Sequence, residues 1–315
     1  MELKSIFVGR SNILRSGWRF AVFFIAFVVL AVAFGGVAQT LLIAANIPSG
    51  QGSMSSLVVN AVFSLIPALF IGWLCGKLLE GLPFRALGAW FTRFWAMHLI
   101  LGLVMGTATI GLAVLIAAAF GGLRFTLNPD QGNTAIWLTL AVSFAVFAIA
   151  AAFEEALFRG YILQTFNRSG LGWLAITLTS VFFGFVHIRN LSAGTISTLN
   201  TILAGVWFGI AYLKTRDLWF VWGMHLMWNW VQGAVFGIEV SGLTDITTAP
   251  LLKEIDKGPT WLTGETYGIE GGIACTFAII ASIAIIYFLP ILKPSEEMLA
   301  LTSSERSESK QGRYI

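Results

Sequence analysis

Two adjacent carboxylates and an arginine, Glu154, Glu155 and Arg159, stand at the far end of a long apolar run that begins near Ile136. A charge placed in or beside hydrocarbon costs on the order of several kcal/mol unless it is paired or hydrated. On a helix, Glu155 and Arg159 share one face, with the acid N-terminal as such pairs prefer. Glu154 points about 100° away from Glu155. We therefore expect Glu155 to be the ion partner of Arg159 and Glu154 to remain available for chemistry.

Two of the three histidines follow farther along the chain, each with a partner one helical turn away. Phe183 and His187 share one helix face, and so do His225 and Asn229. A histidine on an apolar face is more often a satisfied core residue than a catalyst, but two of them with a carboxylate pair and an asparagine favour a catalytic group. The third, His98, lies near the start of an apolar run beside Trp95, and we interpret it as an interfacial residue outside the site.

These side chains can support two schemes, and both end in hydrolysis of an acyl bond. Glu154 and His187 can activate water as general bases, while His225 and Asn229 donate hydrogen bonds to the developing oxyanion. Alternatively, Glu154, His187 and His225 are ligands of Zn²⁺, whose fourth position holds water. The sequence contains no His-Glu-x-x-His zinc motif and no serine in a recognisable nucleophile motif.

The composition bounds the class of protein. Of 315 residues, 57% are hydrophobic and 11% are charged, against roughly 25% charged residues in soluble domains. This predicts an all-α, polytopic membrane helix bundle. The net charge of +3 indicates orientation in the membrane rather than binding of nucleic acid. We interpret Cys75 and Cys275 as small hydrophobic residues.

About eight transmembrane helices are expected from the apolar runs. The first run is longer than the apolar core of a signal peptide, so we interpret it as a retained helix, and Pro67 is expected to kink the second. The approximate ranges are 20–45, 54–76, 94–120, 136 to the first motif, 171–188, 194–213, 218–238 and 271–289. With this topology the outer segments hold only four of the 19 Lys and Arg residues, which predicts that both termini are cytoplasmic.

The chain accordingly divides into five predicted parts: N-terminal transmembrane helices (1–135), a catalytic helix core (136–238), an extracytoplasmic loop (239–270), a last transmembrane helix (271–290) and a polar cytoplasmic tail (291–315). The tail is rich in Ser and Glu and is predicted to be disordered. Glycine pairs at helical spacing, such as Gly102 and Gly106, are expected to serve packing within the bundle. The sequence predicts no oligomeric state.

Three motifs in this order on successive late spans resemble the CPBP intramembrane protease family: Glu154-Glu155-x-x-x-Arg159, Phe183-x-x-x-His187 and His225-x-x-x-Asn229. This family includes the type II CAAX prenyl endopeptidases (CAAX amino terminal proteases) and the bacterial Abi-type bacteriocin-processing and self-immunity proteins. The resemblance covers about residues 136–238. It implies an intramembrane endopeptidase with a water-accessible cavity between helices.

The resemblance implies the role of each residue through the motif that contains it. It makes Glu154, His187, His225 and Asn229 catalytic, and Glu155, Arg159 and Phe183 supporting. The family is often described as a metalloprotease family, and a metal-free account is also held, so Zn²⁺ stays open as a cofactor. The expected partners are the lipid bilayer, in a bacterial plasma membrane, and a peptide or membrane-protein substrate. The rival interpretations are a proton-coupled transporter, in which the same residues relay protons, and a non-catalytic immunity or regulatory membrane protein.

Overall fold

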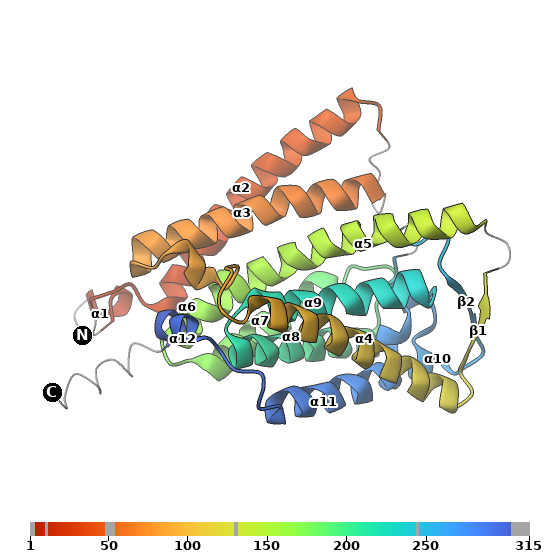
Figure 1. The fold of residues 1–315 in the computed structure, drawn as a ribbon. Helices are drawn as coiled ribbons and strands as arrows, with labels where there is room; N and C mark the ends of the chain where they lie inside the picture. The colour runs from red at the N-terminus through yellow and green to blue at the C-terminus, as the bar shows by residue number, and fades with distance from the viewer. Residues whose placement is uncertain (1–3, 10–11, 48–53, 129–131, 244–245, 304–315) are drawn as a thin grey trace.

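A computed structural model describes residues 4–9, 12–47, 54–128, 132–243 and 246–303 of the chain, and these are mostly helical (Figure 1). The longer helices run side by side along one direction, and α2 with α3 forms a pair at one edge of the bundle. These helices are α2 (Ser16–Ala44), α3 (Met54–Glu80), α4 (Trp95–Ala119), α5 (Asn133–Glu155), α7 (Gly172–His187), α8 (Thr195–Thr215), α9 (Leu218–Trp230) and α11 (Ile273–Phe288).

Short elements lie at the two ends of the bundle, and α1 and α12 lie at the same end (Figure 1). They include α1 (Lys4–Phe7), η1 (Phe84–Leu87), α10 (Thr260–Thr263), η4 (Glu265–Tyr267), η5 (Ile269–Gly271) and α12 (Glu296–Thr302). The predicted turn at 48–52 and the tip of the predicted loop at 129–130 lie outside the described residues.

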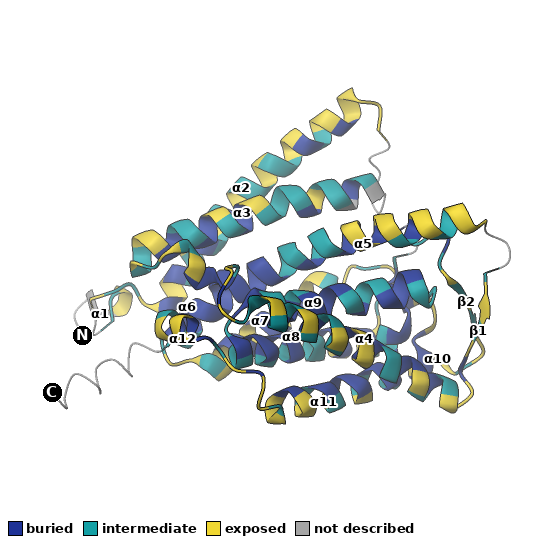
Figure 2. Ribbon diagram, viewed as in Figure 1, coloured by how far each residue is buried: buried dark blue, intermediate teal, exposed yellow. Residues whose placement is uncertain are grey.

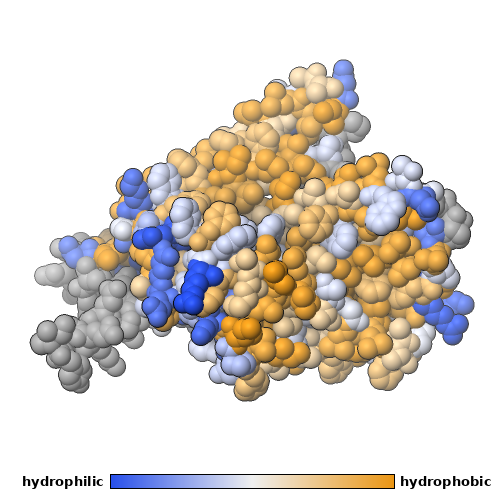
Figure 3. All heavy atoms as spheres, in the orientation of Figure 1, coloured by the Kyte–Doolittle hydropathy of each residue, from blue (hydrophilic) through white to orange (hydrophobic). Residues whose placement is uncertain are grey.

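Five helical stretches of the described chain are long and apolar enough to cross a membrane: Ser16–Ala44, Val58–Glu80, Trp95–Ala119, Asn133–Arg168 and Thr195–Thr215. A helix also occurs in each of the other predicted spans, but α7 and α11 have 16 residues each and α9 has 13. Apolar side chains cover the middle of the face in Figure 3, with hydrophilic side chains gathered toward its ends. The chain is therefore a helical membrane protein, and the structure does not establish the predicted count of eight spans.

The helix observed at the fourth predicted span is much longer than the apolar run with which it begins. Helix α5 continues without a break through η2 (Ala156–Ile162), which is a π-helix, into α6 (Leu163–Arg168), giving 36 helical residues. At 1.5 Å per residue this is roughly 54 Å, well beyond the roughly 30 Å of hydrocarbon. Glu154 and Glu155 therefore lie in the interior of a long helix, next to a π-helical segment of the kind often found at functional sites.

Helix α9, which carries His225 and Asn229, is held tightly against α4. Gly102 and Gly106 lie directly on the backbone carbonyls of Phe220 and Met224, where a β-carbon would overlap the carbonyl oxygen. This confirms that the pair serves packing within the bundle. The buried His98 pairs with Asp217, the residue that caps the start of α9. The prediction of an interfacial His98 was wrong, because a partner far along the chain holds it inside the bundle.

Two predictions about the polar segments are corrected by the structure. The chain is not purely α-helical, since β1 (Leu123–Leu127) and β2 (Leu252–Asp256) form an antiparallel pair. The second strand belongs to the predicted loop 239–270. Part of the predicted disordered tail is folded as α12, which is capped by Ser295 and buries Met298 and Thr302. These apolar contacts explain the order there, and residues 304–315 lie outside the described part of the chain.

The β1–β2 pair contains an unusual carboxyl group, which leads to a testable pH dependence. Burial, and then the neighbouring charges of Glu239 and Asp256, raise the pKa of Glu254 from 4.5 to about 8. The folded state therefore binds this proton more tightly than the unfolded state. We expect the stabilisation to be fully present below pH 4.5 and to be lost as the pH rises toward 8.

The Glu254→Gln variant should lose this part of the pH dependence, because its amide does not titrate. The measurement is the thermal unfolding midpoint of the detergent-solubilised protein at a series of pH values, for the wild type and the variant. The expected result is a midpoint that falls more steeply for the wild type between pH 4.5 and 8. Parallel curves would contradict the assignment.

Candidate active site

One cavity of about 360 Å³ lies between the buried helices of the bundle. Its wall contains all four residues predicted to be catalytic and also the supporting residue Phe183. These side chains come from α5, α7 and α9. Helix α9 is mostly buried, whereas α5 also presents exposed residues (Figure 2). The catalytic candidates at the wall are Glu154, His187, His225 and Asn229.

The two adjacent glutamates have different surroundings, as their angular separation on the helix predicts. Glu155 is buried, with 1% of its side chain exposed, whereas Glu154 lines the cavity with 24% exposed. Glu155 Oε1 accepts hydrogen bonds from Arg159 Nη1 at 3.1 Å and from His225 Nδ1 at 2.8 Å. Glu154 Oε2 has no hydrogen-bond partner among the described residues, and it lies 3.8 Å from His225 Nε2. Glu155 Oε2 also has no hydrogen-bond partner among the described residues, but of the two glutamates only Glu154 lines the cavity.

Arg159 is fully buried within the protein and is not among the residues that line the cavity. Its guanidinium donates to Glu155 and, at 3.1 Å, to the backbone carbonyl of Gly205 in α8. The same group lies 5.0 Å from the ring centre of Phe183 and 5.2 Å from that of Phe208. These cation–π contacts and the ion pair compensate part of the cost of burying the charge. Arg159 thus joins the helices that carry Glu155, Phe183 and Gly205.

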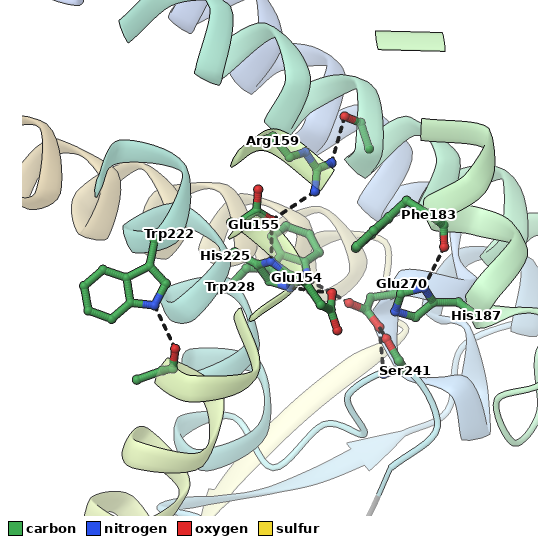
Figure 4. A network of polar contacts seen from close by, with 12 residues as sticks. Glu154, Glu155, Arg159, Phe183, His187, Trp222, His225, Trp228, Ser241 and Glu270 are labelled. Carbon is green, nitrogen blue, oxygen red and sulfur yellow. Dashed lines mark hydrogen bonds and ion pairs between the residues drawn. The ribbon is translucent and has the colours of Figure 1, made fainter. Parts of the chain in front are cut away.

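The hydrogen bonds of both histidines indicate which ring nitrogen carries the proton (Figure 4). His187 Nδ1 lies 2.7 Å from the carbonyl oxygen of Phe183, which can only accept. His225 Nδ1 faces the carboxylate of Glu155, which also accepts, and its ring stacks on Phe208 at 4.7 Å. Neutral His187 and His225 therefore keep the proton on Nδ1 and leave Nε2 with a free lone pair.

The described residues do not provide a set of ligands for the zinc ion of the second scheme. Among the residues that the structure describes, no three His, Cys, Asp or Glu side chains are grouped so that they could hold a metal ion. Zinc sites with three protein ligands need those side chains to converge on one point within about 2.0–2.3 Å. The described residues therefore do not fit a zinc ion.

The cavity also contains polar residues that were not predicted from the sequence. Glu270 is the main one: it lies beyond the predicted core, at the end of the predicted loop, and its carboxylate reaches the cavity beside Glu154 and His187 (Figure 4). The others at the wall are Asn60, Ser64, Asn190, Asn200, Thr201 and Ser241. The only signal available in the sequence was the position of Glu270 next to an apolar run, and helical spacing does not connect it with the motifs.

Taken together, the fold and the cavity define a class: a helical membrane protein with carboxylate, imidazole and amide groups converging in an internal cavity. Residues 135–231 match the family described as type II CAAX prenyl endopeptidase Rce1-like. This match supports the CPBP and CAAX protease family for this segment, as the three motifs predicted. The matched range includes every residue of those motifs and does not include Glu270.

A relative is found in Bacillus subtilis (strain 168), where the similar protein is named uncharacterized protein YyaK. It is 31% identical over 113 residues, which are 33% of this chain and 35% of that protein. The chain thus matches about a third of the relative's length. The name adds no activity, so only the family match bears on function.

Proposed function

We propose that the protein is an intramembrane endopeptidase of a bacterial plasma membrane, which hydrolyses a peptide bond in or near the bilayer. The match of residues 135–231 to a protease family supports this class of reaction. The observation that carries the proposal is that Glu154, His187, His225 and Asn229, from three different helices, line one cavity inside the bundle. Its partners are the lipid bilayer and a peptide or membrane-protein substrate that reaches this cavity.

In the proposed reaction, Glu154 and His187 bind and activate a water molecule. The free Oε2 of Glu154 or Nε2 of His187 accepts a proton from the water as its oxygen bonds to the carbonyl carbon of the substrate. The carbonyl oxygen becomes an oxyanion, which accepts a hydrogen bond from the amide of Asn229. The same proton then passes to the leaving nitrogen as the carbon–nitrogen bond breaks, so the site is restored.

His225 has a conditional role in this scheme. Because Nδ1 donates to Glu155, its Nε2 can donate to the oxyanion only when the ring is protonated on both nitrogens. Glu155 then supplies the counter-charge for the imidazolium. The buried Arg159 keeps Glu155 in place, so Glu155 and Arg159 act as positioning residues.

The proposal is tested by comparing membrane peptides from cells that express the wild type with those from cells that express His187→Ala. Loss of one general base lowers the rate about 10²- to 10⁴-fold. We therefore expect at least one membrane peptide to be shortened only in the wild-type cells. Purified wild-type protein should then cleave the intact form of that peptide in detergent.

Two further outcomes decide between the proposal and its rivals. Cleavage that is abolished by a chelator and restored by zinc would favour a metal version over the metal-free reaction. Equal peptide patterns in the two strains, together with no cleavage by the purified protein, would contradict the protease assignment and favour a transport or regulatory role.

A further inference from the structure

Glu270 is held at the cavity by three hydrogen bonds, none of which supplies a positive charge. Oε1 accepts from Trp228 Nε1 at 2.8 Å, and Oε2 accepts from the backbone nitrogen and the hydroxyl of Ser241, each at 2.7 Å. Its backbone carbonyl accepts from Asn200 Nδ2 at 2.8 Å. Among the described residues, no Lys or Arg forms an ion pair with it. The carboxylate is thus fixed in position without a counter-ion.

The charges around the cavity are unbalanced. The wall carries two carboxylates, Glu154 and Glu270, and none of the described wall residues is Lys or Arg. Of the two histidines at the wall, His225 lies against Glu154 and Glu155, and neither forms an ion pair with Glu270. Arg159 does not compensate for them, since it is buried, does not line the cavity and is bound to Glu155. Two carboxylates in a mostly apolar enclosure are costly unless a positive group is supplied. A cationic group on the substrate would supply it, whereas a free C-terminal carboxylate would be repelled.

The rest of the wall indicates what surrounds such a cation. Apolar side chains of α5 and of the segment after α9 form one side of the cavity, including Val146, Phe147, Leu243 and Ile246. An apolar peptide segment fits these side chains by burying its own surface. Glu270 is the natural partner for a basic residue within that segment, because Glu154 is committed to the water in the proposed reaction.

We propose that Glu270 is a specificity-determining residue that binds the side chain of a lysine or arginine near the scissile bond of an otherwise apolar substrate. This inference rests on the proposed function and adds the class of substrate to it. The carboxylate of Glu270 attracts the cation, and Trp228 and Ser241 keep the carboxylate directed into the cavity. Accepting hydrogen bonds from Trp228 and Ser241 does not require a negative charge at Glu270. A structural role of Glu270 can therefore be tested separately from its recognition of a cation.

The experiment uses purified full-length protein and a library of quenched apolar peptides in detergent, each acetylated at the N-terminus and amidated at the C-terminus. One position is varied among Lys, Gln and Glu and is moved along the peptide. We expect the wild type to cleave the best Lys peptide with a kcat/KM about tenfold above that of its Gln counterpart, and the Glu counterpart least, because charge complementarity gives specificity. In Glu270→Gln the ratio of Lys to Gln should fall to about one, while the Gln peptide is still cleaved.

The Trp228→Phe variant is the control for a structural role, because it removes a hydrogen bond to Glu270 and keeps the charge. Its preference for Lys should persist even if its overall rate falls. If Glu270→Gln does not fold, Glu270→Asp replaces it and a homolysine peptide, whose side chain is one methylene longer than lysine, is added to the library: the shorter acid should move the preference from lysine toward homolysine. An unchanged preferred length would contradict the assignment.

The failure of this inference is distinguishable from failure of the proposed function. If the wild type cleaves no peptide of the library and no membrane peptide in cells, the protease assignment fails. If it cleaves peptides without a preference for Lys, or if the preference survives in Glu270→Gln, the reaction stands and the role of Glu270 is wrong.

Discussion

Replacing Glu154 by Gln should lower kcat for peptide cleavage about 10³-fold, because the variant cannot accept the proton of the attacking water. The structure makes this substitution nearly isosteric and harmless to folding, since Glu154 Oε2 has no hydrogen-bond partner to lose among the described residues. The measurement is the single-turnover rate of cleavage by the purified variant, with its thermal unfolding midpoint recorded in the same detergent. An unchanged midpoint with little cleavage is the expected result.

The neighbouring Glu155 offers a matched control, because its replacement should change the unfolding midpoint as well as the rate. Glu155 is buried and accepts hydrogen bonds from both Arg159 and His225. The Glu155→Gln variant removes the counter-charge of a fully buried arginine, so it should lower the unfolding midpoint as well as the rate. Full activity in Glu154→Gln, with activity lost only in Glu155→Gln, would reverse the roles assigned here to the two carboxylates.

Replacing Glu80 by Ala should cost about 3–5 kcal/mol of stability, the usual effect of breaking a buried ion pair from one side. Glu80 has 3% of its side chain exposed, and it pairs with Arg19 of α2 at 2.6 Å and with Arg168 of α6 at 2.8 Å. Arg168 Nε adds a second hydrogen bond at 2.9 Å. One carboxylate thus joins α3 both to its neighbour in the chain, α2, and to the distant α6. The expected result is a large fall in the unfolding midpoint in detergent.

An exposed ion pair at the same end of the bundle serves as the control. Arg85 and Glu297 are 2.8 Å apart, but their side chains are 47% and 39% exposed. Such pairs contribute about 0–1 kcal/mol, so Glu297→Ala should leave the midpoint nearly unchanged. If Glu80→Ala is as mild as Glu297→Ala, the buried network does not hold α2 and α6 to α3.

The parts of the site that follow from local helix geometry could be predicted from the sequence. Residues four apart on a helix lie on one face whatever the helix packs against. The pairing of Glu155 with Arg159 is such a case, and so is the separation of Glu154 from Glu155. The membrane class follows from composition, because apolar runs of this length have few other stable environments. The three motifs in order were sufficient to indicate the family.

Partners distant in the sequence were not predictable in the same way. The apolar pattern placed His98 at an interface, but its partner Asp217 lies 119 residues away. The β1–β2 pair joins two polar segments whose alternation was too weak to indicate strands. Glu270 came from a predicted loop, and only the folding of that loop over the helix ends brings its carboxylate to the cavity.

The sequence by itself determined that the chain is a membrane helix bundle and which side chains have the right types for hydrolysis. It could not determine that Glu154 and His187 line the same cavity, because in simple spans they fall near opposite ends of neighbouring helices. The tertiary structure decided this through the continuous helix from Asn133 to Arg168, which places Glu154 in its interior rather than at its end. The reason is that spacing along a helix fixes only the direction in which each side chain points around the axis of that helix. The depth of a residue in the bundle depends on how long each helix is and where its neighbours pack.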